Sequence, residues 1–162
     1  MKFNIKRILP WVAVFLWMAV IYFFSAQTGE MSGDTSGSIT RWLIEHIYIG
    51  FKDLAIEQQD EIMAIVHTLL RKGAHFTEYA LLAILVSNAI RVYKPKILLK
   101  WLIPIGFSAV YAVTDEIHQY FVPERACRLF DVFIDTSGAA FGTIVFIVIS
   151  YIIYKTKTKQ KV

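Results

Sequence analysis

Cysteine is almost absent from this sequence, since Cys127 is the only one in 162 residues. A single cysteine excludes an internal disulfide and any cysteine-rich zinc site. Charged residues are also scarce, at 19%, whereas hydrophobic residues make up 56%, which is too apolar for an ordinary soluble domain. A phosphate-binding glycine loop, a nucleophilic serine motif, a nucleic-acid-binding surface and an internal repeat are likewise missing. We therefore expect one membrane domain over residues 1–162, partnered by the lipid bilayer and not by nucleic acid.

Four segments are long enough to cross a bilayer, which takes about 20 helical residues. The second of them reaches that length only if His75 and Glu78 lie inside the helix near one end. For the first, a cleaved signal peptide is the alternative, although its apolar run is longer than a usual signal core. We predict transmembrane spans at about 8–25, 73–92, 97–115 and 135–154.

Two segments between the first and second spans are amphipathic. Their apolar residues recur at three- and four-residue steps, from Ser38 to Gly50 and from about Glu57 to Leu70. Neither is apolar enough to span, so we expect both helices on the outer membrane surface or capping the bundle. Residues 28–38, rich in Gly, Ser and Thr, have the composition of a flexible connector. The predicted class is an all-α integral membrane protein with four transmembrane helices and two amphipathic extracytoplasmic helices.

The charges are distributed asymmetrically. Eleven of the 17 basic residues lie in three acid-free segments: the N-terminus, the link between the second and third spans, and the C-terminal tail. Cytoplasmic segments are enriched in Lys and Arg. We therefore predict a multi-pass protein of the cell membrane with both termini cytoplasmic and residues 26–72 and 116–134 outside. The lysine-rich tail suits anionic lipid headgroups.

The helix that enters the second span carries polar residues on one face. Arg71, His75 and Glu78 follow at helical spacing, with Lys72 beside them, whereas His67 is interpreted as a surface residue. An ionised carboxylate such as Glu78, one turn inside a span, costs several kcal/mol unless it is paired or hydrated. Glu78 is thus either a functional residue or half of a structural ion pair with a downstream arginine.

The outer end of the third span carries a matching set. Asp115, His118 and Gln119 share a helical face, and Glu116 points about 100° away from Asp115. Because the second and third spans run antiparallel, their polar ends meet at one depth. We predict a catalytic set of His75, Glu78, Asp115, Glu116 and His118.

Three interpretations of this set remain open. Histidine–carboxylate pairs on facing helices suit a divalent metal, with His75, Glu78, Asp115 and His118 as candidate ligands. The same residues suit a proton relay or general acid–base site. They also fit a purely structural polar network. A divalent metal is therefore a candidate cofactor without being required.

Between the third and fourth spans, a turn after Pro123 contains two guanidiniums that can hold phosphate or carboxylate in bidentate fashion. Two aspartates open the fourth span, where they either complement the helix dipole or join the site. Gly138 and Gly142 are interpreted as helix packing, and Cys127 as incidental. The predicted ligand-binding residues are Arg71, Lys72, Gln119, Arg125, Arg128, Asp131 and Asp135.

These segments together resemble the VanZ-like membrane protein family. The matching pieces are Phe24 to Gln27, Arg71 to Tyr79, Tyr111 to Gln119, Phe121 to Arg125, and Asp131 to Gly138. Glu124 departs from the pattern, which has glycine there. The resemblance implies a bacterial, Gram-positive envelope protein whose shared feature is the polar cluster; the family's namesake is associated with reduced susceptibility to the glycopeptide teicoplanin.

The sequence leaves three functions open. The first is an outward-facing site that binds or modifies an anionic lipid-linked or cell-wall molecule, with turnover undecided. The second is a non-catalytic small transporter or lipid-translocating protein whose buried charges form a relay or gate. The third is a structural partner of another membrane protein, which it would contact through the glycine face.

Overall fold

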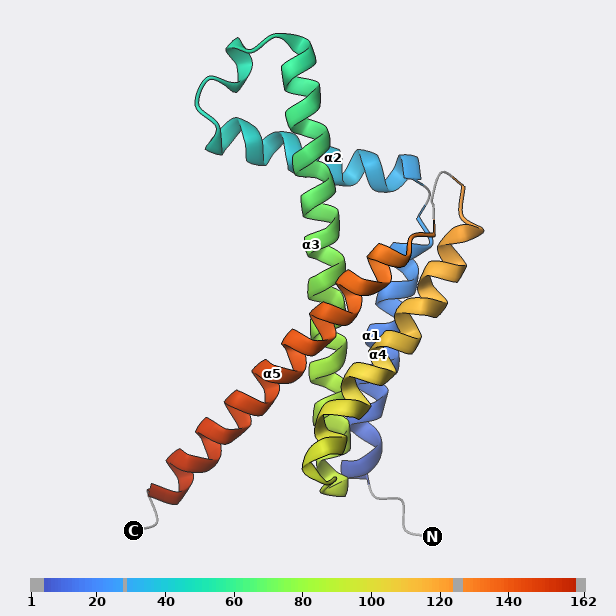
Figure 1. Cartoon of the computed structure of the whole chain (residues 1–162), viewed down its shortest axis with the longest axis vertical. Coiled ribbons are helices and arrows are strands. Elements are labelled where there is room, and N and C mark those ends of the chain that lie inside the picture. Colours follow the sequence, from blue (N-terminus) through green and yellow to red (C-terminus); the bar gives the residue numbers. More distant parts are fainter. Residues whose placement is uncertain (1–4, 28, 124–126, 160–162) are drawn as a thin grey trace.

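The computed structural model describes residues 5–27, 29–123 and 127–159. Over these residues the chain forms five α-helices, two short 3₁₀-helices and no strand, so the predicted all-α class is confirmed (Figure 1). The elements are α1 (Ile5–Ser25), α2 (Gly29–Ile47), η1 (Phe51–Asp53), α3 (Ile56–Ile90), η2 (Arg91–Tyr93), α4 (Ile97–Tyr120) and α5 (Leu129–Lys159).

Three of the described helices, α1, α4 and α5, are long and apolar enough to cross a membrane. They correspond to the first, third and fourth predicted spans, and each extends beyond the predicted bounds. The polar residues that seemed to end the apolar runs continue the helices instead: α4 includes Asp115 to Tyr120, and α5 begins six residues before Asp135. The polar residues of α4 and α5 therefore lie on rigid helix ends.

The second predicted span is not confirmed, so four spans are not established. Residues 73–92 do not form a helix of their own: the amphipathic helix predicted over 57–70 continues to Ile90 as α3, 35 residues long, and residues 91 and 92 belong to η2. No proline interrupts the join, and the single Gly73 costs only about 1 kcal/mol in a helix interior. At 1.5 Å per residue, α3 is roughly 50 Å long, and its first half extends beyond the bundle (Figure 1).

The flexible connector predicted over residues 28–38 is wrong from Gly29 onward, where α2 begins; Thr28 lies outside the described residues. Without a proline to stop it, a helix stabilised by packing can propagate through residues of turn-like composition. That packing involves α3, with Thr40 and Ile44 buried. The helix ends before the predicted Gly50, which takes a left-handed φ of +90°.

The bundle alternates in direction. Helices α1 and α4 run towards one end and α3 and α5 towards the other, with α5 packed chiefly on α3 (Figure 1). The core between them is formed by fully buried Val14, Ile21, Tyr79, Leu82 and Val86. Large apolar side chains such as Phe15 and Leu16 remain exposed, as expected for a lipid-facing surface.

At one end of the bundle lie the start of α1, the α3–α4 turn and the end of α5; at the other lie the end of α1, the end of α4 and the start of α5 (Figure 1). The described residues of the three acid-free basic segments belong to the first end, which we call the basic end. The predicted catalytic residues lie towards the second. Which end faces the cytoplasm stays a prediction.

Candidate functional site

Polar side chains from three helices gather near the α4–α5 connection. The Asp135 carboxylate interacts electrostatically with four other carboxylates, and the Asp115 carboxylate with His75 and His118. We call this group the polar cluster: Lys72, His75, Glu78 and Tyr79 of α3, Asp115, Glu116, His118 and Gln119 of α4, and Asp131 and Asp135 of α5.

Asp135 lies at the centre of the polar cluster. Its side chain is completely buried, and its Oδ1 lies 3.7 Å from His75 Nδ1. Neither oxygen accepts a hydrogen bond from the described residues. Because an unsatisfied buried carboxylate is costly, this position calls for a proton, a water or a ligand donor. The sequence left Asp135 between helix capping and the site; in the structure it lies six residues after the start of α5, buried beside His75.

Asp115 and its neighbours form the α4 wall of the cluster. Asp115 is buried, and its Oδ2 accepts a hydrogen bond of 3.0 Å from Gln119 Nε2 one helical turn later. His118 is partly buried and packs against the ring of Tyr22 of α1, with the ring centroids 4.6 Å apart. The predicted shared face of Asp115, His118 and Gln119 therefore turns into the bundle.

Glu116 is positioned differently from its predicted catalytic partners. It is also buried, and its Oε2 accepts a 2.8 Å hydrogen bond from the backbone N–H of Arg128. This hydrogen bond joins the end of α4 to the residue that precedes α5. Glu116 therefore anchors the start of α5.

The rim of the cluster carries the positive charges. Lys72 Nζ lies 3.2 Å from Asp131 Oδ1 and 4.5 Å from the Phe130 ring centroid, so this cation is already engaged. Arg71 is partly buried, Arg128 is exposed, and neither pairs with a carboxylate among the described residues. Arg125 lies outside the described residues.

Two glycines set the register between α3 and α5. A Cβ at Gly138 would overlap the Phe76 carbonyl, and one at Gly142 would overlap the Ala80 carbonyl. The predicted packing role of both glycines is confirmed. Since α3 and α5 run in the same direction, this close contact places Asp135, one turn earlier, opposite His75.

Sequence reasoning missed Tyr79 and Ser25 as members of the site region. Tyr79 is fully buried, its hydroxyl has no hydrogen-bond partner among the described residues, and it interacts electrostatically with Asp115 and Asp135. Ser25, at the end of α1, is also buried, and its side chain interacts with the Asp115 carboxylate. For Tyr79, the sequence did carry a signal: its phenolic hydroxyl directly follows Glu78, at the start of an apolar run.

The metal interpretation gains no support from this geometry. Over the described parts of the chain, no three or more His, Cys, Asp or Glu side chains are grouped so as to hold a metal ion. The cluster instead offers paired acids and histidines, which suit proton exchange and hydrogen bonding.

Three membrane-length helices around a buried charge cluster define a multi-pass membrane protein. The chain belongs to the VanZ/LLP1 family, whose model matches residues 10–151. This match confirms the resemblance seen in the sequence. No curated protein and no solved structure matches the chain significantly.

Proposed function

We propose that the polar cluster binds an anionic lipid-linked or cell-wall molecule at the outer face of the membrane and exchanges protons with it. The observation that carries this proposal is the buried Asp135 carboxylate, which lies 3.7 Å from His75 and receives no hydrogen bond from the described residues. A bound hydroxyl or acidic phosphate would supply the missing donor.

The rim supplies the means of holding an anion. Arg71 and Arg128 are not paired with carboxylates among the described residues, and a guanidinium binds phosphate or carboxylate in bidentate fashion. Lys72 is neutralised by Asp131 and contributes less. A ligand with its anionic group at this rim and a hydroxyl towards Asp135 would contact both halves of the site.

A lipid-linked ligand fits the surroundings of the cluster. Tyr22 and Phe23 of α1 expose their rings beside it, and Tyr120 and Phe121 do so at the end of α4. Aromatic rings of this kind favour the membrane interface. Membership of the VanZ/LLP1 family supports an envelope role. Teicoplanin susceptibility is the phenotype associated with the family's namesake, so we measure it in the test below.

The second candidate function is non-catalytic, and a specific observation favours it. The Lys72–Asp131 and His75–Asp135 contacts both join α3 to α5, and Glu116 holds the intervening connection. Such a network is what a purely structural cluster, or a relay in a translocating protein, would require.

The test compares His75→Gln and Asp135→Asn with the control His46→Gln, which changes an exposed histidine of α2. Each protein is purified in nanodiscs, and binding of a polyprenyl pyrophosphate is measured beside membrane abundance and teicoplanin susceptibility in a bacterial host. We expect both cluster variants to lose at least ten-fold in binding, and their hosts to become more susceptible to teicoplanin, at normal abundance. If abundance falls in proportion to activity, or if the wild type binds no polyprenyl pyrophosphate, the binding proposal fails and the structural function stands.

A further inference from the structure

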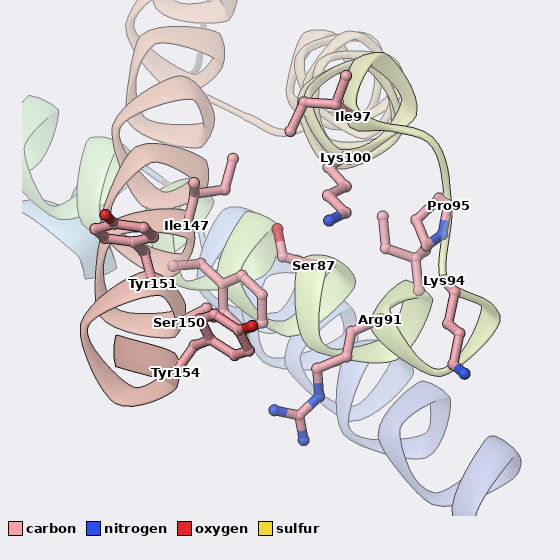
Figure 2. Close-up of a pocket in the computed structure, with 12 residues that line it drawn as sticks. Ser87, Arg91, Lys94, Pro95, Ile97, Lys100, Ile147, Ser150, Tyr151 and Tyr154 are labelled. Atoms are coloured by element: carbon pink, nitrogen blue, oxygen red, sulfur yellow. The ribbon is translucent and has the colours of Figure 1, made fainter. Parts of the chain in front are cut away.

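A second polar site lies at the basic end, far from the polar cluster. A pocket of about 480 Å³ opens between the end of α3, the start of α4 and the second half of α5 (Figure 2). Its lining includes Arg91, Lys94 and Lys100 and no acidic residue. The pocket plays no part in the function proposed above.

The cations of this pocket are not balanced by carboxylates of the described residues. None of Arg91, Lys94 and Lys100 forms an ion pair with them. Helix α4 begins at the pocket, with Ile97 in its wall and no acid in its first turn, so the positive end of the helix dipole adds to the field. The pocket is therefore complementary to a negative charge.

Ser87 provides an independent sign of a missing polar partner. It lines the pocket, it is only 4% exposed, and its hydroxyl forms no hydrogen bond with the described residues. Ser87 and Lys100 both extend into the space between the helices, whereas Arg91 and Lys94 lie at the rim (Figure 2). A hydroxyl donor beside an ammonium matches the oxygens of a phosphate group.

The remaining walls identify the kind of molecule that carries the phosphate. Ile97, Phe146 and Ile147 give the pocket an apolar lining, and Tyr151 and Tyr154 of α5 place amphipathic rings at its edge. Tyrosines favour the membrane interface. A ligand for this pocket thus combines a phosphate with hydrocarbon.

We propose that this pocket binds the headgroup phosphate of an anionic membrane phospholipid, with Ser87 and Lys100 on the phosphate oxygens, Arg91 and Lys94 at the rim, and the acyl chains along α5. Basic pockets between membrane helices commonly bind such headgroups. The bound lipid would fill the space between α5 and the α3–α4 turn.

Native mass spectrometry of the purified full chain, titrated with dioleoylphosphatidylglycerol, tests this inference. We expect at least ten-fold weaker retention of this lipid in the double variant Arg91→Gln/Lys100→Gln, and about three-fold weaker in Ser87→Ala. The control double variant Arg41→Gln/Lys52→Gln removes the same charge from two exposed positions outside the pocket and should change retention less than two-fold. Equal losses in the two double variants would overturn the site in favour of general charge attraction.

A second measurement uses only the wild-type chain and does not depend on the folding of any variant. Phosphatidylglycerol should raise its Tm by several degrees, whereas dioleoylphosphatidylcholine should not. Inorganic phosphate at millimolar concentration should neither raise the Tm nor displace the lipid. An equal effect of phosphatidylcholine, or displacement of the lipid by free phosphate, would contradict the proposal.

Discussion

At the residue scale, the buried carboxylates divide into two kinds. Glu116 is held by the backbone N–H of Arg128, and Asp115 by the amide of Gln119. Asp135 instead has His75 at 3.7 Å and no hydrogen bond from the described residues. The first two carboxylates are satisfied by the fold, so the proposed binding function rests on Asp135.

We predict that Glu116→Ala lowers stability without directly removing ligand contacts. It leaves the Arg128 N–H of this partly buried hydrogen bond without its acceptor, and losing a hydrogen bond to a charged group costs about 1–3 kcal/mol. A lower Tm in detergent would show this, with Glu61→Ala, at an exposed position of α3, as the control. An unchanged Tm with lost binding would instead make Glu116 a binding residue.

The Lys72–Asp131 pair gives a second prediction at this scale. Both side chains are mostly buried, so Lys72→Met leaves an uncompensated carboxylate and should cost about 1–3 kcal/mol. The exchange Lys72→Asp with Asp131→Lys should restore at least half of the lost stability, measured as Tm. If the exchanged protein is no more stable than the single variant, the two residues do not act as a pair.

Much of the cluster was predictable at this scale, because the positions of carboxylates and histidines within apolar helices are visible in the sequence. His75 and Asp115 were expected at one depth, and both belong to the cluster. Tyr79 was missed because tyrosine also packs as an ordinary core aromatic. Only the three-dimensional packing reveals that its hydroxyl is buried among acids.

At the element scale, the contact between α3 and α5 determines the geometry of the cluster. The two helices run in the same direction. Because Gly138 and Gly142 have no side chains, the backbones of α3 and α5 come into close contact. This approach brings Asp131 to Lys72 and Asp135 to His75. The two glycines therefore determine the geometry of the polar cluster indirectly, through the position of α5.

We expect Gly138→Ala to displace α5 and to lower the free energy of unfolding by about 1–3 kcal/mol, because the added Cβ would overlap the Phe76 carbonyl. The matched control is Gly106→Ala in α4, where a Cβ meets no atom within 4 Å. The control should be neutral or slightly stabilising, since alanine favours a helix over glycine. Equal Tm values for the two variants would show that the helices are not in close contact.

The helices were predicted only in part from the sequence. The apolar runs predicted α1, α4 and α5 correctly, because each of these runs coincides with one helix. They failed for α3, because its apolar and polar halves form one continuous helix. Periodicity reports the faces of a helix, whereas its ends depend on proline, on caps and on packing against neighbours.

At the scale of the whole molecule, the two ends of the bundle differ in chemistry. One end carries the acidic polar cluster, and the other carries Arg91, Lys94 and Lys100, which line the second pocket. Such asymmetry is how the positive-inside rule is expressed in a folded chain. It predicts that the polar cluster opens to the outside of the cell.

The native cysteine allows this orientation to be measured directly. Cys127 is exposed and lies next to Arg128, at the same end as the polar cluster. A membrane-impermeant maleimide applied to intact cells should label Cys127, and Cys127→Ser should abolish the labelling. A cysteine introduced as Lys157→Cys in the Cys127→Ser background should react only after permeabilisation. Labelling of Lys157→Cys on intact cells, with Cys127 protected until the membrane is opened, would contradict the outward-facing site.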